Sequence, residues 1–505
     1  MTSAAPLALS ILLIASPLVA QEVSISPQTE ECLDCHDYYH PGLVADWKSS
    51  RHARTTPAEA LKKNALERRV SSPDIPLQMQ SHAVGCYECH GLNPDRHADN
   101  FEHFGYQINV VVSPNDCRTC HAREVEEYAG SKKAHALDNL QQNPLYSTLV
   151  ETITGVETLE DGVLTSLPAS HSTKSETCYA CHGTHVQVRG LKEIDAGDET
   201  AIVPDLSGWP NQGVGRINPD GSSGSCTACH PRHSFSIEIA RKPYTCAQCH
   251  LEPDVPAWNV YRESKHGNIF LSDQNRWNWD QVPWRVGLDF RAPTCATCHN
   301  SLIVTPDGDP ISSRTHDFGS RLWVRIFGLV YTHPQPESGQ THLIRNGDDL
   351  PLPTTFTGQP ADEYLITPEE QADRRAAFQR LCQSCHAIDW AASHFTRLDS
   401  TIAETDRMTL AATRLISTAW EEGLASPVNP FDESLEHRWM RQWLFYANSV
   451  RYGSAMSGPD YAAFKNGWWQ MNENLRKLYE EIEAKKQAAA FPPEEEAAEA
   501  DLYEP

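Results

Sequence analysis

Basic residues are few in this 505-residue chain, in which 42 lysines and arginines face 67 aspartates and glutamates, for a formal net charge of −25. This balance excludes a protein that reads nucleic acid by neutralising phosphates, and it argues against binding to an anionic membrane surface. A basic partner protein suits the charge. Solubility and shielding of other acidic groups explain it equally well.

Long apolar runs are absent after the first residues, and a membrane-spanning helix needs roughly 20 consecutive apolar residues, so we expect no span in the mature chain. The N-terminus, "MTSAAPLALSILLIASPLVA", is apolar, ends in small residues and is followed at once by polar sequence. This pattern predicts a secretory signal peptide cleaved after Ala20, with a buried N-terminal helix as the alternative. We therefore expect a periplasmic protein.

No cysteine stands outside one repeated motif. The 16 cysteines form eight C-x-x-C-H pentapeptides, in which two thiols attach to the vinyl groups of a haem and the next histidine coordinates its iron. Zinc sites or disulfides would not require a histidine after every second cysteine. We predict eight covalently bound haem c groups, held by Cys32, Cys35, His36, Cys86, Cys89, His90, Cys117, Cys120, His121, Cys178, Cys181, His182, Cys226, Cys229, His230, Cys246, Cys249, His250, Cys295, Cys298, His299, Cys382, Cys385 and His386.

The cofactors must supply much of the core, because eight haems in this chain leave about 63 residues each, roughly a marginal small domain. The 27 glycines and 34 prolines favour loops around them. We predict a mainly α multihaem cytochrome c fold, with a loop-rich body and long C-terminal helices. The expected parts are a signal peptide at 1–20, a body with seven haems at 21–366, a helical region with the eighth haem at 367–490 and an acidic disordered tail at 491–505.

Regular helices are expected toward the C-terminus. Thr367 followed by Pro368 and acidic residues predicts the start of a helix that carries the last motif. The stretches 402–422 and 433–490 alternate apolar and charged residues at helical period, so we expect long helices that pack on the haem body or on a neighbouring subunit. Residues 321–364 look like a loop-rich insertion ending in a linker.

Fifteen of the 23 histidines lie outside the motifs. Electron-transfer haems usually take a second histidine, whereas a haem that does chemistry keeps one face open. The best candidates for this distal role are His52, His135, His233, His266 and His316, and those that compete for the remaining irons are His97, His103, His185 and His394. Exposure, or a hydrogen bond to a haem propionate, is the alternative for each.

His233 presents a particular case because it follows the motif histidine His230 by three residues. The porphyrin bound by His230 shields the opposite axial position from a residue so close in the chain. His233 therefore either binds the iron of a neighbouring haem or bonds a propionate.

The stretch "CTACHPRHSFSIEIARKPYTCAQCHLEPDVPAWNVYRESKHG", followed by "APTCATCHN" and "THDFGSRL", resembles the octahaem hydroxylamine oxidoreductase family. The resemblance covers most of the mature chain and includes the motif count. It implies a largely helical subunit, often a homotrimer, with seven six-coordinate haems and one five-coordinate catalytic haem. That haem belongs to the fourth motif, so the resemblance makes His182 the proximal residue of the substrate site.

In hydroxylamine-oxidising members a tyrosine from a neighbouring subunit is cross-linked to the catalytic haem, and an Asp-His pair handles protons. By this resemblance the C-terminal stretch "MSGPDYAAFKNGWWQMN" offers Tyr461 as the cross-linking candidate. The chain has no Asp-His dipeptide, and Asn211 and Gln212 stand where that pair is expected. Asn and Gln cannot act as bases, so this departure bears on the direction of the reaction.

Three functions follow from the resemblance. The first is oxidation of hydroxylamine at the open haem, with electrons drained through the other seven. The second is the same scaffold run in reverse, reducing nitrite or hydroxylamine to ammonia. The third is a non-catalytic electron-transfer protein with every iron six-coordinate. The expected electron partner is a small cytochrome c or a quinol-linked protein.

Overall fold

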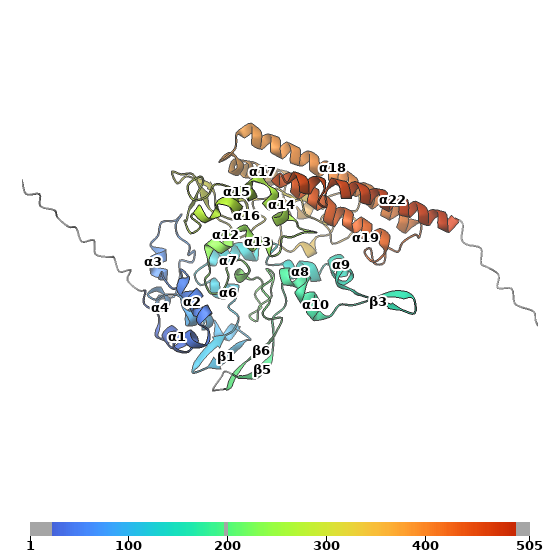
Figure 1. Cartoon of the computed structure of the whole chain (residues 1–505). Helices are drawn as coiled ribbons and strands as arrows, with labels where there is room; N and C mark the ends of the chain where they lie inside the picture. The colour runs from blue at the N-terminus through green and yellow to red at the C-terminus, as the bar shows by residue number, and fades with distance from the viewer. Residues whose placement is uncertain (1–22, 196–199, 491–505) are drawn as a thin grey trace, which may run out of the picture.

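The computed structural model describes residues 23–195 and 200–490, so the expected signal peptide and acidic tail lie outside the described residues. Most of the ordered backbone is helical, and the strands form small two- or three-stranded sheets. Figure 1 shows a body of short helices and loops, with long helices of the C-terminal region laid along one side. The predicted mainly α, loop-rich fold is confirmed.

The helices of the N-terminal part are short. Several begin at a proline that follows a capping residue, such as Ser26 before Pro27 and Thr56 before Pro57. Proline suits the first turn, where its missing N–H is not needed. The elements are α1 Pro27–Tyr39, α2 Pro41–Ser49, α3 Pro57–Leu61, α4 Leu77–Gln80, α5 Cys86–His90, β1 Asn100–His103, β2 Tyr106–Asn109, α6 Pro114–Cys117, α7 Ala122–Ala129, α8 Ala136–Gln141 and α9 Pro144–Thr154.

The middle of the chain contains two long hairpins and the next group of motifs. Each hairpin is antiparallel and forms a sheet of its own. The elements are β3 Val156–Glu160, β4 Val163–Leu167, α10 His171–Glu176, α11 Cys178–His182, β5 Gln187–Asp195, β6 Thr200–Ser207, α12 Ile237–Arg241, α13 Pro243–Ala247, α14 Ala257–Glu263, α15 Lys265–Asp273, β7 Trp284–Arg285, α16 Cys295–His299, β8 Ile303–Val304, β9 Pro310–Ser312, β10 Val324–Arg325 and β11 His333–Pro334.

The C-terminal region begins as the sequence predicts, because the side chain of Thr367 accepts a hydrogen bond from the amide of Glu370 at the start of α17. The stretch 433–490 is divided among several helices and a π-helical segment rather than forming one. The elements are α17 Pro368–Gln383, α18 Ile388–Glu421, α19 Ser434–Met440, a π-helical segment Arg441–Ala447, α20 Asn448–Met456, α21 Pro459–Ala463 and α22 Trp468–Ala490. No helix in the ranges 23–195 and 200–490 is long and apolar enough to cross a membrane.

The largest apolar core joins these helices to the stretch 321–364. Val330 and Leu352 are buried there against Ile416, Trp439 and Leu478. The stretch is loop-rich, but its apolar residues are held under α18, α19 and α22, so it is not a free linker. The predicted domain boundary at 366/367 is not tested by this packing and stays a prediction.

A second core, rich in tryptophan, lies beside the later motifs. It contains Phe270, Trp277, Trp279, Trp284 and Phe290. The indole N–H of Trp284 donates to the carbonyl of Asn278 at 3.1 Å, which satisfies a polar group that burial would otherwise leave unpaired. This core fixes α15 and α16, which present His266 and the seventh motif.

Candidate haem sites

Each C-x-x-C-H motif folds into about one helical turn. Three motifs coincide with complete short helices, α5, α11 and α16. In others the histidine amide donates to the carbonyl of the first cysteine, as in His121 to Cys117 at 2.8 Å and His250 to Cys246 at 2.9 Å. Residues three and four apart lie on one side of a helix. The turn therefore presents two thiols and an imidazole together, as a covalently attached haem requires.

Several motif histidines are oriented by a backbone carbonyl. The Nδ1–H of His90 donates to the carbonyl of Asn109 at 2.7 Å, that of His121 to Arg69 at 3.1 Å and that of His182 to Ala136 at 3.1 Å. Such a bond fixes the ring and leaves Nε2 for a metal. Burial lowers the pKa of His90, His121 and His182, which favours the neutral imidazole that binds iron.

Four motif histidines each face a second histidine from elsewhere in the chain. Two imidazoles that share one metal at about 2.0 Å per nitrogen have ring centroids roughly 6 Å apart. The centroid distances are His36–His103 6.3 Å, His52–His121 6.2 Å, His90–His233 6.5 Å and His266–His386 6.0 Å. The spacing fits an iron between each pair, and it places His233 opposite the second motif rather than its own.

His316 lies in a similar environment near the fifth motif. Burial and the nearby charge of His230 lower its pKa to about 4. Its Nδ1 is buried, with no hydrogen-bond partner among residues 23–195 and 200–490. Its backbone amide donates to Glu127 at 2.8 Å, which ties the loop to α7.

The remaining candidates have other arrangements. The Nε2 of His135 donates to the carbonyl of Ala129 at 2.9 Å, and the Nε2 of His394 donates to the carbonyl of Ala455 at 3.0 Å. In each ring the Nε2 is therefore bonded to the backbone. His185 is exposed and lies near the amide of Gln187 at 3.5 Å. The structure therefore brings His52, His233 and His266, and the competitor His103, opposite motif histidines, but not these three.

His97 is buried between two carboxylates. Its Nδ1 is 3.1 Å from Asp99 and its Nε2 is 3.1 Å from Asp116, and all three side chains are almost fully buried. Burial lowers the pKa of His97, but the hydrogen bonds that its ring donates to Asp116 and Asp99 outweigh this effect and raise it to about 10. The ring is thus an imidazolium with both nitrogens occupied, which does not suit an iron ligand.

His333 was not among the residues that sequence reasoning singled out. Its Nδ1 donates to the carbonyl of Pro334 at 2.6 Å, and its Nε2 is buried without a partner in the part of the chain that the structure describes. Burial lowers its pKa to about 3. It lines a small cavity together with Tyr146 and Arg325. The only sequence signal is a histidine within the apolar run "GLVYTHP".

Two cationic side chains and one carboxylic acid lie beside the fourth motif. Asp254, Lys133 and Arg325 all act on the pKa of His182, the acid raising it and the two cations lowering it. Burial raises the pKa of Asp254 itself above its ordinary value. A cationic environment attracts a small anion, and a carboxylic acid with a raised pKa keeps its proton to a higher pH than an ordinary one.

Asn211 and Gln212 lie next to the fourth motif but are engaged in local structure. The Nδ2 of Asn211 donates to the carbonyl of Tyr179 at 2.8 Å, and its Oδ1 accepts from the amide of Gly213 at 2.9 Å. Gln212 accepts from the hydroxyl of Thr227 and donates to the carbonyl of Pro210. These amides shape the loop beside the motif.

Tyr461 is buried inside its own chain. It is 2% exposed on α21, and its hydroxyl donates to the carboxylate of Glu252, two residues after the sixth motif. Burial and Glu252 raise the pKa of Tyr461. The side chain therefore points at a group of the same chain rather than outward.

Thiols of different motifs lie side by side, which shows the order of the motifs in space. The side chain of Cys32 lies next to that of Cys86, and the same holds for Cys117 and Cys226, Cys181 and Cys249, and Cys246 and Cys295. These contacts join motif 1 to 2, motif 3 to 5, motif 4 to 6 and motif 6 to 7. Haems attached at adjacent thiols would lie close enough together for electrons to pass between them.

Comparison with known proteins finds similarity to multihaem cytochromes. Residues 220–303 match the family described as "Seven times multi-haem cytochrome CxxCH", and residues 116–202 match "Cytochrome c554 and c-prime". A solved structure described as a hypothetical multiheme protein is 44% identical, with a TM-score of 0.88, over 94% of this chain and 98% of that one.

Two further similarities are more distant. A probable nitrite reductase-hydroxylamine oxidoreductase fusion protein of Kuenenia stuttgartiensis is 25% identical over 407 residues, which cover 79% of this chain but 38% of that protein. The chain thus spans well under half of this curated relative. A reducing HAO-like protein complex of the same organism shares the fold, with 18% identity and a TM-score of 0.62 over 92% of this chain and 86% of that one.

The repeated motif, the fold and the 44% identical structure define a multihaem c-type cytochrome that binds haem covalently. The chain therefore belongs to the multihaem cytochromes, and within that class it is similar to a hydroxylamine oxidoreductase fusion protein and to an HAO-like complex. The family resemblance drawn from the sequence is confirmed.

Proposed function

We propose that the chain is an octahaem reductase that converts nitrite or hydroxylamine to ammonia at the haem of the fourth motif. Eight haems are proposed because all sixteen cysteines fall in complete motifs. Iron in this position supplies a site that binds small nitrogen compounds through nitrogen and delivers electrons. The residues of this chain hold that group, bring electrons to it and supply protons.

The position of Tyr461 carries the choice of direction. A cross-link to a haem of a neighbouring subunit requires a tyrosine at the surface, whereas Tyr461 is 2% exposed and bonded to Glu252 of its own chain. Without a cross-link the fourth haem is an ordinary one, which suits donation of electrons to substrate. Asn211 and Gln212, which cannot take protons, add to this argument.

The charges around the fourth motif also favour reduction. Lys133 and Arg325 provide positive potential beside His182, which would attract nitrite. The reduction of nitrite or hydroxylamine consumes protons and releases water, so the site needs an acid. Asp254 fits this role, because burial raises its pKa and its backbone carbonyl is held by the side chain of Asn448 at 3.2 Å. We assign Asp254 as the proton donor.

The other seven haems serve electron transfer in this proposal. His103, His52, His233 and His266 are the proposed distal ligands of the first, third, second and eighth motifs, because each faces the corresponding motif histidine at 6.0–6.5 Å. His316 is proposed for the fifth motif. His135, proposed from the sequence, would need its ring to turn away from Ala129 to bind an iron.

The expected setting of this reaction is the periplasm, where a small basic cytochrome c or a quinol-linked protein supplies electrons. The net charge of −25 would accelerate encounter with a basic donor. The predicted signal peptide, periplasmic location and homotrimer belong to this proposal.

The direction is tested by turnover of the purified holoprotein. With reduced methyl viologen as donor, we expect ammonia from both nitrite and hydroxylamine. Rapid reduction of an added cytochrome c by hydroxylamine, with no ammonia formed, would establish the oxidative alternative. Failure of nitrite, hydroxylamine and nitric oxide to perturb any haem spectrum would establish the electron-transfer protein.

The role of Asp254 is tested by Asp254→Asn. Loss of a general acid typically costs about 10²–10⁴-fold in turnover. The matched control is the exposed Asp74→Asn, which we expect to leave turnover unchanged. Equal rates in the two variants would remove Asp254 from the site.

A further inference from the structure

The β3–β4 hairpin exposes apolar side chains that nothing in the chain covers. Leu159 is 71% exposed and Leu164 is 66% exposed, and Val156, Val163 and Leu167 are also exposed. In Figure 1 the hairpin extends beyond α9 and α10, away from the rest of the molecule. Monomeric proteins rarely expose contiguous apolar groups of this kind without a binding function.

The hairpin is a regular element rather than an irregular loop. All five residues of β3 pair in register with those of β4. Asp161 and Gly162, both at positive φ, form the two-residue turn that suits the twist of a hairpin. Because an isolated two-stranded hairpin is marginally stable in water, this one needs a surface to pack against.

Leucines and an acid share one face of the hairpin. Leu159 lies directly opposite Leu164 in the register, and Glu157, two residues before Leu159, points to the same side because strand side chains alternate. Glu160 and Asp161 follow at the tip. None of these three acids forms an ion pair with residues 23–195 or 200–490. The projecting end is therefore apolar with an acidic rim.

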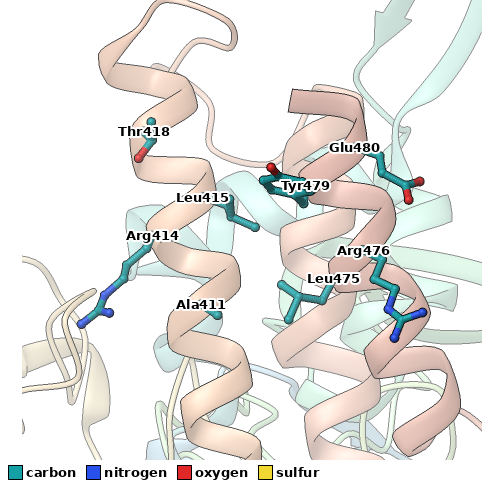
Figure 2. Close-up of a pocket in the computed structure, with 8 residues that line it drawn as sticks. All are labelled: Ala411, Arg414, Leu415, Thr418, Leu475, Arg476, Tyr479 and Glu480. Carbon is teal, nitrogen blue, oxygen red and sulfur yellow. The ribbon is translucent and has the colours of Figure 1, made fainter. Parts of the chain in front are cut away.

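A groove with an apolar lining and a rim of opposite charge lies between α18 and α22. Its volume is about 520 Å³, and Ala411, Leu415, Leu475 and Tyr479 contribute its apolar lining. Figure 2 shows Leu415, Leu475 and Tyr479 directed into the space between the two helices. A groove of this size accommodates several aliphatic side chains.

The rim of the groove is basic. Arg414 on α18 and Arg476 on α22 extend to its two outer sides in Figure 2. Both are exposed, and neither forms an ion pair within the described part of the chain. Glu480 is the one acid that lines the groove. Two free guanidinium groups flank an apolar floor, which matches two leucines flanked by acids.

We propose that the β3–β4 hairpin of one copy of this chain docks in the α18–α22 groove of a second copy. Leu159 and Leu164 fill the groove, Glu157 on their face pairs with one of Arg414 and Arg476, and Glu160, which points to the other face of the hairpin, pairs with the other. The contact joins different surfaces of the two copies, so it is head-to-tail and closes into a ring when the rotation permits. It does not depend on the proposed reaction, but it rests on the proposed association of copies and names the two surfaces that meet.

The contact would also connect the copies near the fourth motif. β4 is followed by α10, which packs against α11, the helix of Cys178 and His182. Lys174 of α10 is paired with Glu151 of α9, so the base of the hairpin is tied to the body. Docking of the hairpin tip would thus hold the segment that leads into this motif.

The first test is the mass of the holoprotein in solution, by sedimentation velocity at micromolar concentration. We expect the wild type to assemble, and we expect Leu159→Asp with Leu164→Asp to weaken assembly by about a hundredfold or more, because two buried leucines become charged. Leu77→Asp on α4, where Leu77 is 81% exposed, is the matched control and should assemble normally. A wild type that sediments as single copies would overturn the proposal.

The second test separates docking from misfolding. Arg414→Glu with Arg476→Glu should prevent assembly, and adding Glu157→Lys with Glu160→Lys in the same chain should restore it. Only charges that face each other across the interface can compensate in this way. Normal assembly of the arginine variant, or no restoration in the fourfold variant, would contradict the pairing.

A photo-crosslinking residue at position 159 identifies the occupant of the groove. We expect the cross-linked peptide to come from α18 or α22 of another copy of the chain. A cross-link to another segment of the chain, or to an electron-donor protein instead, would overturn the proposal.

Discussion

The histidines outside the motifs differ in what surrounds their rings. His233 and His103 face a motif histidine at about the spacing of a shared metal. His394 and His135 bond a backbone carbonyl, and His97 has a carboxylate at each nitrogen. The same residue type therefore serves as a candidate ligand, a structural hydrogen-bond donor and a buried cation.

The assignment of His233 predicts a change in spin state. In His233→Ala the iron facing His90 loses its second ligand, so one low-spin haem should become high-spin in the electron paramagnetic resonance spectrum. His394→Ala is the control, because its Nε2 bonds the carbonyl of Ala455 at 3.0 Å. An unchanged number of low-spin haems in His233→Ala would make His233 a partner of a propionate.

The buried charge of His97 predicts a dependence of stability on pH. Its pKa is about 10 in the folded chain and roughly 6.5 in the unfolded chain. A raised pKa contributes stability that is complete below about pH 6.5 and is lost as the pH rises toward 10. The free energy of unfolding should therefore fall over this interval, by a few kcal/mol at most.

The variant His97→Asn tests this directly. It leaves Asp99 and Asp116 buried without their cation, so we expect a loss of about 3–5 kcal/mol at neutral pH. The pH dependence between about 6.5 and 10 should also become shallower. The exposed His171→Asn is the control. Parallel curves for the wild type and His97→Asn would contradict the assigned charge.

At the scale of elements, the long C-terminal helices depend on one shared core. Leu478 of α22 is fully buried among residues of α18, α19 and the stretch 321–364. Leu478→Ala should cost about 2–5 kcal/mol in denaturant unfolding, because removal of a buried leucine leaves a cavity. Lys477→Ala, one position along on the exposed side, should change stability by about 0.5 kcal/mol or less. Equal effects would contradict the packing of α22.

The helices were predictable to different degrees. The helix start at Thr367 could be predicted from the neighbouring residues alone, and in the structure the Thr367 side chain caps the helix. The stretch 433–490 was predicted from apolar period, but the chain turns at Ser457, which has positive φ, and restarts at Pro459. The Gly-Pro pair at 458–459 indicates that break in the sequence. A prediction from the spacing of apolar residues alone does not take it into account.

The site was predictable where spacing determines it and not where the fold does. The proximal histidines follow from the motif alone. The facing pairs join residues far apart in sequence, such as His52 and His121, and no local pattern distinguishes His103 from His97. His333 was missed because its burial and its orphan Nε2 arise from loops that pack only in three dimensions.

For the molecule as a whole, neighbouring thiols arrange the motifs as a connected path, because Cys89 and Cys120, Cys229 and Cys246, and Cys298 and Cys382 also act on one another electrostatically and join the pairs described above. Motif 6 lies at a branch, because Cys249 contacts Cys181 of motif 4 and Cys246 contacts Cys295 of motif 7. The proposed catalytic haem, that of motif 4, is thus next to the haem of motif 6 and lies to the side of the path. Electrons from a donor at any point of the path could reach it through motif 6.

The central claim is that a single chain carries eight haems and no covalent bond to its neighbours. Intact mass of the secreted, mature protein under denaturing conditions measures both properties at once. We predict one species, a single chain with eight haems attached. A chain with seven or fewer haems, or chains that stay joined through a haem, would contradict the account.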